Sequence, residues 1–268
     1  MSAPDLSDAY ENGKYIDAAE TYPPRWAEKA KAFRNRLGAR GKCQLNIAYG
    51  DHPRERFDLF LPDMAPTGLV VFVHGGYWKA FDKSAWSHLA AGALARGFAV
   101  AIPSYRLAPD IAVAGITRQI ARMIEVAAGE IAGPIYLTGH SAGGHLVTRM
   151  LCSDLTWSGC FPARIAGVVS ISGLHDLRPL LQTGMNAVLD LDKDTAAAES
   201  VILCADVLPV PVTAFVGANE RPAFIQQARW LARAWPSATV HIQPDCHHFN
   251  VIDGLEQADS VLMTKLLG

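Results

Sequence analysis

A serine between two glycines is the feature of this sequence whose spacing points most directly to chemistry. Gly139, Ser141 and Gly143 form the pattern Gly-x-Ser-x-Gly, directly after the apolar run 135–137 and before the helix-compatible stretch 146–151. In a sharp turn from strand to helix a serine takes strained backbone angles, and flanking side chains would collide with the neighbouring strand and helix. The helix that follows directs N–H groups toward the serine. The sequence therefore predicts a nucleophile at Ser141.

A second glycine turn, one strand earlier, predicts the groups that would stabilise an oxyanion. The stretch 74–78, His-Gly-Gly-Tyr-Trp, directly follows the apolar run 69–73. Acyl transfer needs donors aimed at the tetrahedral oxygen, and backbone N–H groups at a glycine turn supply them without rearranging. We expect the N–H groups of Gly76, Tyr77 and Ala142 to form this oxyanion hole.

The aromatic pair after these glycines is predicted to shape the substrate site. Tyr77 and Trp78 can wall a narrow acyl pocket and offer a face for ring stacking. We place Trp78 in the substrate pocket; the alternative is that its ring packs into the core and only shapes the turn.

The general base must be a histidine downstream of the serine. The candidates are His145, His175, His241, His247 and His248. The first lies on the helix behind the nucleophile, the second follows an earlier strand, and the third lies inside the last strand. The loop 244–249 leaves the carboxyl end of that strand, where open α/β sheets place ligand sites. We therefore predict His248 as the base, with His247 as a neighbour that orients the loop or has no specific role.

A carboxylate must hold the imidazole of the base in its working tautomer. Glu220 follows the apolar run 212–216 at the mouth of the same sheet, which preserves the chain order serine, acid, histidine. Asp176, one strand earlier, is the rival, and Asp245 is too close to His248 in the sequence to reach round the ring. We predict Glu220 as the acid.

Apolar runs of strand length recur along the chain and predict the sheet that positions these residues. The uninterrupted runs cover residues 69–73, 98–102, 135–137, 165–171 and 212–216. Such runs fit strands covered on both faces, and helical periods at 113–124 and 224–235 indicate consecutive βα units. An alternating stretch at 57–61, ended by Pro62, indicates one half-buried strand. The prediction is an α/β-hydrolase fold, a mostly parallel, doubly wound sheet with helices on both faces.

The chain is predicted to form a single domain of 268 residues, without a linker or an internal repeat. Residues 1–40 are expected to be an N-terminal arm, helical or irregular, that lies over the main body. Residues 177–207 are helix-compatible and long for a connection, so we expect a lid insertion that walls the acyl pocket.

Composition and charge disfavour several classes of partner. The net charge is −2, which gives no basic surface for nucleic acid or an anionic membrane. We find no signal peptide and no apolar run long enough to span a bilayer. The five cysteines lack the spacing of a disulfide framework or a zinc site: Cys43, Cys152, Cys160, Cys204 and Cys246. We expect a soluble, cytoplasmic protein with no metal or other cofactor, and the sequence leaves a homodimer open.

Four stretches together resemble the α/β-hydrolase kynurenine formamidases (arylformamidases), which lie beside the hormone-sensitive-lipase-like carboxylesterases. These stretches are 74–78 (His-Gly-Gly-Tyr-Trp), 105–109 (Tyr-Arg-Leu-Ala-Pro), 139–146 (Gly-His-Ser-Ala-Gly-Gly-His-Leu) and 248–249 (His-Phe). The aromatic pair Tyr77-Trp78, in place of a third glycine, favours the formamidases over the general esterases. The likeness extends to Tyr49-Gly50 and Val216-Gly217, and so covers nearly the whole chain.

The resemblance implies a triad and a reaction. Ser141, Glu220 and His248 match the family's triad, and the three N–H donors named above match its oxyanion hole. The implied activity is hydrolysis, through an acyl-enzyme, of a small formyl-like amide of an aromatic amine such as N-formylkynurenine. The alternative is a carboxylesterase or thioesterase on short acyl chains, which the same groups would serve. A hydrolase fold reused only for binding is disfavoured, because a binding module needs none of these groups together.

Two features depart from the family pattern. The acid here is glutamate, where the formamidases usually carry aspartate. The segment 177–207 has no feature that matches an aromatic amine. The acyl size and leaving group therefore stay open at this point.

Overall fold

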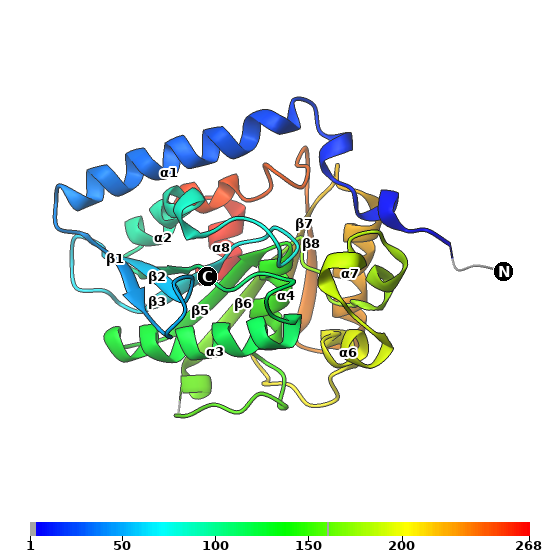
Figure 1. Cartoon of the computed structure of the whole chain (residues 1–268). Helices are drawn as coiled ribbons and strands as arrows, with labels where there is room; N and C mark the ends of the chain where they lie inside the picture. The colour runs from blue at the N-terminus through cyan, green and yellow to red at the C-terminus, as the bar shows by residue number, and fades with distance from the viewer. Residues whose placement is uncertain (1–3, 160) are drawn as a thin grey trace.

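Eight strands form one central sheet in the computed structural model, which describes residues 4–159 and 161–268 (Figure 1). The strands are β1 (Cys43–Ala48), β2 (Arg56–Phe60), β3 (Leu69–Val73), β4 (Ala99–Pro103), β5 (Ile135–His140), β6 (Ile165–Ile171), β7 (Val212–Gly217) and β8 (Ala238–Gln243). They lie in the order β1-β2-β4-β3-β5-β6-β7-β8. Strand β2 runs antiparallel to β1 and β4, and the remaining pairs are parallel. The predicted mostly parallel sheet is confirmed.

Each face of the sheet carries its own hydrophobic core, which explains the uninterrupted apolar runs. In β3 the first, third and fifth residues belong to one cluster of buried side chains, and the second and fourth belong to the other. Successive side chains of a strand point to opposite faces, so a strand covered on both sides must be apolar throughout.

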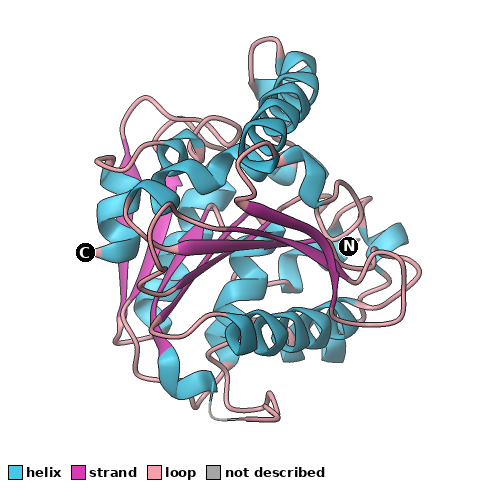
Figure 2. Cartoon of the chain, turned by 90° about the vertical axis from the view of Figure 1, so that its left-hand side faces the viewer, coloured by secondary structure: helices cyan, strands magenta, loops and turns pink. Residues whose placement is uncertain are grey.

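Helices cover both faces of the sheet, as Figure 2 shows. The α-helices are α1 (Tyr22–Gly38), α2 (Ala91–Ala95), α3 (Val113–Glu130), α4 (Ala142–Arg149), α5 (Asn186–Leu189), α6 (Lys193–Ala198), α7 (Pro222–Ala234) and α8 (Val261–Leu267). Apolar side chains of α3, α4 and α7 fill one core, and those of α1, α2 and α8 fill the other. Helix α7 begins at Pro222, where a proline in the first turn is tolerated because its missing N–H has no acceptor there.

Short 3₁₀-helices occupy many of the connections. They are η1 (Ser7–Tyr10), η2 (Gly13–Tyr15), η3 (Ala19–Thr21), η4 (Lys83–Ala85), η5 (Ser87–Ala90), η6 (Phe161–Arg164), η7 (Arg178–Gln182), η8 (Val201–Leu203) and η9 (Asp253–Glu256). Three of them precede α1, so the first part of the described chain is a series of tight turns followed by one long helix.

Residues 4–40, the described part of the predicted N-terminal arm, lie over the main body. In Figure 1 helix α1 crosses the top of the molecule above α2 and α8. The Trp26 ring lies 4.8 Å from that of Trp86, between η4 and η5. At the other end of the arm, Asp8 forms a 2.8 Å ion pair with Arg221. The amide of Leu6 donates a 2.8 Å hydrogen bond to the Gln182 carbonyl.

The segment 177–207 packs against α7 rather than standing free. It contains η7, α5, α6 and η8. The indole Nε1 of Trp235 donates to the Val201 carbonyl at 3.1 Å, and the Leu177 amide donates to Ser200 Oγ at 2.8 Å. The carbonyl of Gln182 holds the arm at Leu6, so this segment supports the arm.

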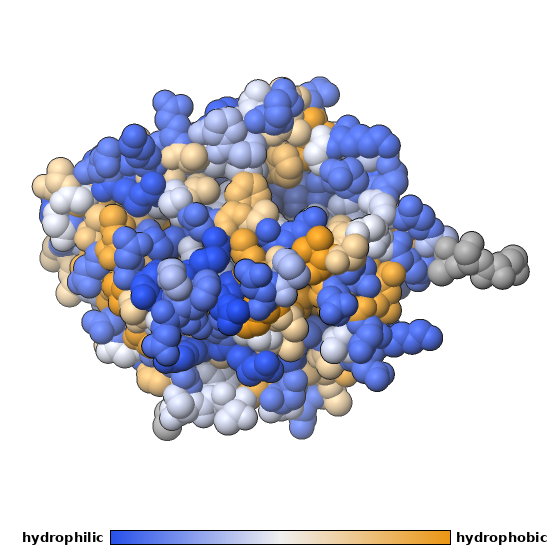
Figure 3. Space-filling view, viewed as in Figure 1, coloured by the Kyte–Doolittle hydropathy of each residue, from blue (hydrophilic) through white to orange (hydrophobic). Residues whose placement is uncertain are grey.

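The face of the molecule drawn in Figure 3 is mostly hydrophilic, with hydrophobic residues interspersed. In the part of the chain that the structure describes, no helix combines the length and apolarity needed to cross a bilayer. The thiols of Cys43, Cys152, Cys204 and Cys246 are free, and Cys160 lies outside the described residues.

Candidate active site

Ser141 lies on a strained turn between β5 and α4. Its backbone angles are φ 56° and ψ −117°, a region that side chains rarely occupy, and the residue is 2% exposed. A Cβ on Gly143 would overlap the carbonyl of Val73, and one on Gly139 would overlap the backbone of Gly143. Both glycines are therefore required by close backbone approach, which is the reason that the sequence pattern suggested.

The glycine turn after β3 passes directly beside this serine. A Cβ on Gly75 would lie 2.8 Å from the His140 carbonyl oxygen and 3.0 Å from Ser141 Cβ. The turn reverses with positive φ angles of 106° at Gly76 and 49° at Tyr77. Within residues 4–159 and 161–268, the N–H groups of Gly76, Tyr77 and Ala142 donate no hydrogen bond, Ala142 because it begins α4. Three donors are thus free at the predicted oxyanion hole.

Glu220 and His248 form a buried pair. His248 Nδ1 lies 2.7 Å from Glu220 Oε2, and the two side chains are 5% and 0% exposed. The other carboxylate oxygen, Oε1, accepts from Ser172 Oγ at 2.5 Å and from the Gly217 amide at 2.8 Å. Three donors therefore fix the carboxylate, and a glutamate fills the position where the resembling family carries aspartate.

The other histidines have partners elsewhere. His247 accepts from the Phe249 amide at Nδ1 and bonds Tyr22 Oη at 3.1 Å through Nε2, and burial lowers its pKa. His145 bonds the Glu199 carbonyl at 2.8 Å, and its burial lowers the pKa to about 3. His175 forms a hydrogen bond with Ser170 Oγ, and the ring of His241 stacks on the ring of Phe215.

The rival acid is also committed to other groups. Asp176 accepts from Arg178 at 2.8 and 2.7 Å and from Ser200 Oγ at 3.2 Å. Asp245 is exposed. The geometry thus brings Glu220, rather than either aspartate, to His248.

His140, the residue before the serine, connects the nucleophile turn to the loop of His248. Its Nε2 donates to the His248 carbonyl at 2.8 Å, and the two rings lie 4.6 Å apart. Burial, with the neighbouring His248, holds the pKa of His140 well below its usual range. The ring is therefore a neutral donor that fixes the backbone of His248, a contact that the sequence did not indicate.

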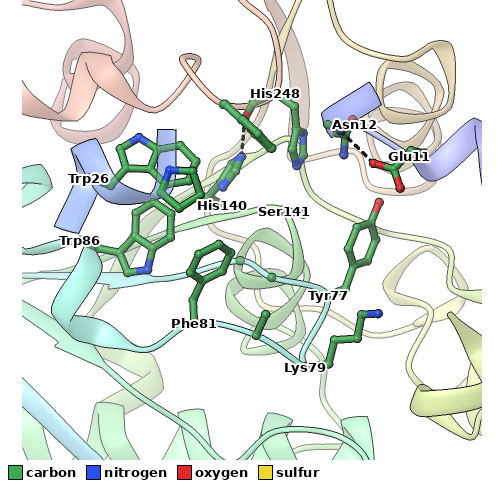
Figure 4. A pocket seen from close by; sticks show the side chains of 16 residues that line it. Glu11, Asn12, Trp26, Tyr77, Lys79, Phe81, Trp86, His140, Ser141 and His248 are labelled. Carbon is green, nitrogen blue, oxygen red and sulfur yellow. Dashed lines mark hydrogen bonds between the residues drawn. The ribbon is translucent and has the colours of Figure 1, made fainter. Parts of the chain in front are cut away.

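A cavity of about 260 Å³ opens above Ser141 and His248 (Figure 4). Trp26, Phe81 and Trp86 lie on one side of Ser141 in Figure 4, and Glu11, Asn12, Tyr77 and Lys79 lie on the other. The arm contributes Glu11, Asn12, Gly13, Pro23 and Trp26 to this lining.

Two expectations about the pocket are wrong. Among the described residues that line it, none comes from the segment 177–207, which contacts α7 through η8; the arm walls the pocket instead. Trp78 is fully buried, with its ring 5.2 Å from that of His145, and does not line the pocket. Tyr77 and Trp78 both have positive φ, and the turned backbone sends the Trp78 ring beneath the turn into the core.

Three potential metal ligands meet at the far end of α4. The ligand atoms of Cys152, Asp154 and Cys204 lie within 4.8 Å of one another. The guanidinium of Arg149 donates to both Asp154 oxygens, at 3.0 and 2.7 Å. Since this cation already neutralises the carboxylate, the cluster fits a metal ion poorly.

Comparisons with known proteins agree with this geometry. Residues 57–229 match the family model described as BD-FAE. A kynurenine formamidase from Danio rerio is 31% identical over 238 residues, which cover 83% of this chain and 80% of that protein. A solved structure of a candidate thioesterase from Silicibacter sp. tm1040 is 52% identical, with a TM-score of 0.96 over 99% of this chain and 100% of that one. Esterase B from Lactobacillus rhamnosis, at 16% identity, shares the fold with a TM-score of 0.66 over 91% of this chain and 92% of that one.

Proposed function

The chain belongs to the BD-FAE family and to the kynurenine formamidase group of α/β-hydrolases, and from that membership we propose that it hydrolyses the formamide of an aromatic amine such as N-formylkynurenine. That it is a hydrolase follows from the family. The pocket is the observation that supports this substrate. Ser141 and His248 line a small cavity with an aromatic wall, and Glu220 is hydrogen-bonded to His248.

The reaction would follow the serine-hydrolase scheme. Ser141 Oγ attacks the formyl carbon while His248 Nε2 takes its proton, and Glu220 stabilises the imidazolium. The N–H groups of Gly76, Tyr77 and Ala142 hold the oxyanion. Collapse of the tetrahedral species breaks the C–N bond, and His248 returns the proton to the departing arylamine. Water, activated by the same histidine, then releases formate from the serine.

The dimensions and lining of the cavity support a small aromatic substrate. A volume of about 260 Å³ lies just below the range of about 300–1,000 Å³ typical of small-molecule sites. Trp26 and Trp86 line the cavity, so an aryl leaving group can pack against their rings. A cavity of this volume with an aromatic wall can hold a formyl group together with an aryl amine.

The alternative is a short-chain thioesterase or carboxylesterase. The candidate thioesterase from Silicibacter sp. tm1040 favours it, because its likeness extends over the whole chain at 52% identity. The same serine, base and oxyanion donors would cleave such substrates without alteration.

Acyl chain length separates the two functions. With one aryl leaving group, we expect kcat/KM to fall from formyl to acetyl to butyryl after correction for intrinsic reactivity. An esterase pocket would instead gain up to about 0.8 kcal/mol, roughly four-fold in kcat/KM, for each buried methylene. A profile that rises from formyl to butyryl refutes the formamidase. The Ser141→Ala variant is the control and should lose about three or more orders of magnitude in kcat on every substrate.

For the location of this reaction we propose the cytoplasm. The thiols of Cys43, Cys152, Cys204 and Cys246 are free, as is usual in a reducing compartment. The proposed ligand class is a small-molecule substrate, with no nucleic-acid or membrane partner.

A further inference from the structure

The pocket has two chemically distinct halves on either side of Ser141. Figure 4 shows the rings of Trp26, Trp86 and Phe81 on one side. On the other side are a carboxylate, an amide, a phenol and an ammonium group, from Glu11, Asn12, Tyr77 and Lys79. An aromatic wall serves an arylamine, but it leaves the polar half without a role in cleavage of the formamide.

Asn12 has a buried acceptor with no partner. The residue is 6% exposed, and Oδ1 accepts no hydrogen bond from any group in the described chain. It stands at the N-cap of η2, where an asparagine side chain commonly accepts a backbone N–H, yet here it caps nothing. A buried unpaired acceptor is destabilising, and Asn12 lines the pocket, so a bound ligand can supply the donor that the described chain does not.

The backbone two residues before Asn12 is held to the catalytic body. The hydroxyl of Tyr77 donates to the carbonyl of Tyr10, and Gln227 Nε2 donates to Tyr10 Oη at 3.1 Å. Tyr10 itself is 3% exposed and packs edge-on against Phe224. The amide of Asn12 is therefore positioned relative to the oxyanion turn before any ligand binds.

Opposite charges flank this amide. One oxygen of Glu11 accepts from the Gly13 amide at 3.0 Å, which leaves the other free, and Glu11 forms no salt bridge within the described residues. The Lys79 ammonium is exposed and likewise has no acidic partner among those residues. A carboxylate, a buried acceptor and an ammonium on one side of a pocket match a zwitterion.

We propose that Asn12, Glu11 and Lys79 form a subsite for the α-amino-acid head group of the arylformamide. Asn12 Oδ1 and the Glu11 carboxylate accept hydrogen bonds from the substrate ammonium, and Lys79 pairs with its carboxylate. The inference rests on the proposed function. The amino-acid chain of N-formylkynurenine is attached, through the ketone, to the ring carbon ortho to the one that bears the formamide nitrogen, so it can extend toward the polar half while the ring packs on the aromatic half.

The test compares two formamides with the same reacting group. N-formylkynurenine carries the amino-acid chain, and 2-formamidoacetophenone keeps the ring and the ketone without it. In the Asn12→Leu variant, we expect KM for N-formylkynurenine to rise about 10-fold or more with kcat nearly unchanged, because a hydrogen bond to a charged group is lost. KM for 2-formamidoacetophenone should stay within about two-fold. The melting temperature should not fall, because leucine removes an unsatisfied buried acceptor.

Lys79→Met tests the carboxylate contact separately. We expect a higher KM for N-formylkynurenine and no change for its carboxamide, which lacks the negative charge. Asn35→Leu, on the exposed face of α1, and Lys193→Met, at the start of α6, are matched controls outside the pocket and should leave both substrates unaffected.

Each failure has a distinct meaning. If the wild-type protein cleaves both formamides with equal kcat/KM, the formamidase activity stands and the subsite is refuted. A lower melting temperature for Asn12→Leu with unchanged KM would show a structural role for Asn12 and also refute it. If neither formamide is cleaved while esters or thioesters are, the proposed function fails, and the subsite falls with it.

Discussion

Replacing Glu220 by glutamine should abolish catalysis while preserving the fold, and the hydrogen bonds of Glu220 give the reason. The Gly217 amide can only donate, so the glutamine carbonyl oxygen must take the place of Oε1. Its NH₂ group then occupies the place of Oε2, 2.7 Å from His248 Nδ1. An NH₂ group donates, so His248 Nδ1 must accept, and the ring proton moves to Nε2. In that tautomer Nε2 cannot take the proton of Ser141.

The expected loss is large. A wrong tautomer at a triad base costs about 10⁴-fold in kcat, which corresponds to about 5.5 kcal/mol of transition-state stabilisation. The fold should survive, because the amide keeps its bonds with Gly217 and Ser172 and leaves no unpaired buried charge. Steady-state kinetics on N-formylkynurenine or an activated ester, beside thermal melting, measures both quantities.

The matched control makes the same chemical change at the rival acid. Asp176→Asn should keep kcat within a few-fold, because Asp176 bonds Arg178 and Ser200 rather than His248. The reasoning is refuted if Glu220→Gln keeps most of its activity while Asp176→Asn is inactive.

Three further predictions concern the base, the elbow and pH. His248→Ala should lose kcat nearly as severely as removal of the serine, and His247→Ala much less; the reverse order in steady-state kinetics would show that the wrong histidine was chosen. Gly143→Ala should yield little folded protein because its Cβ overlaps the Val73 carbonyl, whereas Gly129→Ala, with open space at its Cβ, should melt no lower than the wild type. Among the histidines whose pKa burial lowers, His74, His88, His145 and His175 stay neutral when folded and gain protons near pH 6.5 when unfolded. Each of these histidines therefore lowers the free energy of unfolding by about 1.4 kcal/mol per pH unit, as the pH falls from about 6.5 toward the pKa of that histidine in the folded protein. These folded-state pKa values are about 4 for His74 and His88 and about 3 for His145 and His175. A free energy of unfolding, measured in urea, that is the same at pH 7 and pH 5 would contradict this prediction.

The central strands could be predicted because burial on both faces leaves a direct mark on the sequence. The runs 69–73 and 165–171 match β3 and β6 residue for residue. Strand β1 left no such mark, since it lies at the sheet edge, is mostly exposed and shifts register between Gln44 and Ile47. An edge strand with polar side chains has no periodicity that separates it from a loop.

The candidate triad was predicted from a different signal, motif order and strand ends, and the structure shows Glu220 and His248 as a buried hydrogen-bonded pair. The residues that wall the pocket could not be predicted from the sequence, because the docking of the arm over the sheet depends on contacts between residues that are distant in the sequence. Nothing local to Asn12 or Trp26 indicates that they lie beside Ser141. Trp78 was misplaced because two successive aromatic residues with positive φ are uncommon, and only the backbone path shows where the second ring points.

The arm's contacts also order the events of folding. Gln227 and His247, which bond Tyr10 and Tyr22, follow them by 217 and 225 residues. Contacts between such distant segments close long loops and carry an entropic cost that local turns and helices do not. During synthesis the elbow and the oxyanion turn are complete well before the arm can find its partners. Because Glu220 and His248 emerge together with these partners, we expect the Glu220–His248 pair and the binding pocket to be the last parts of the molecule to form.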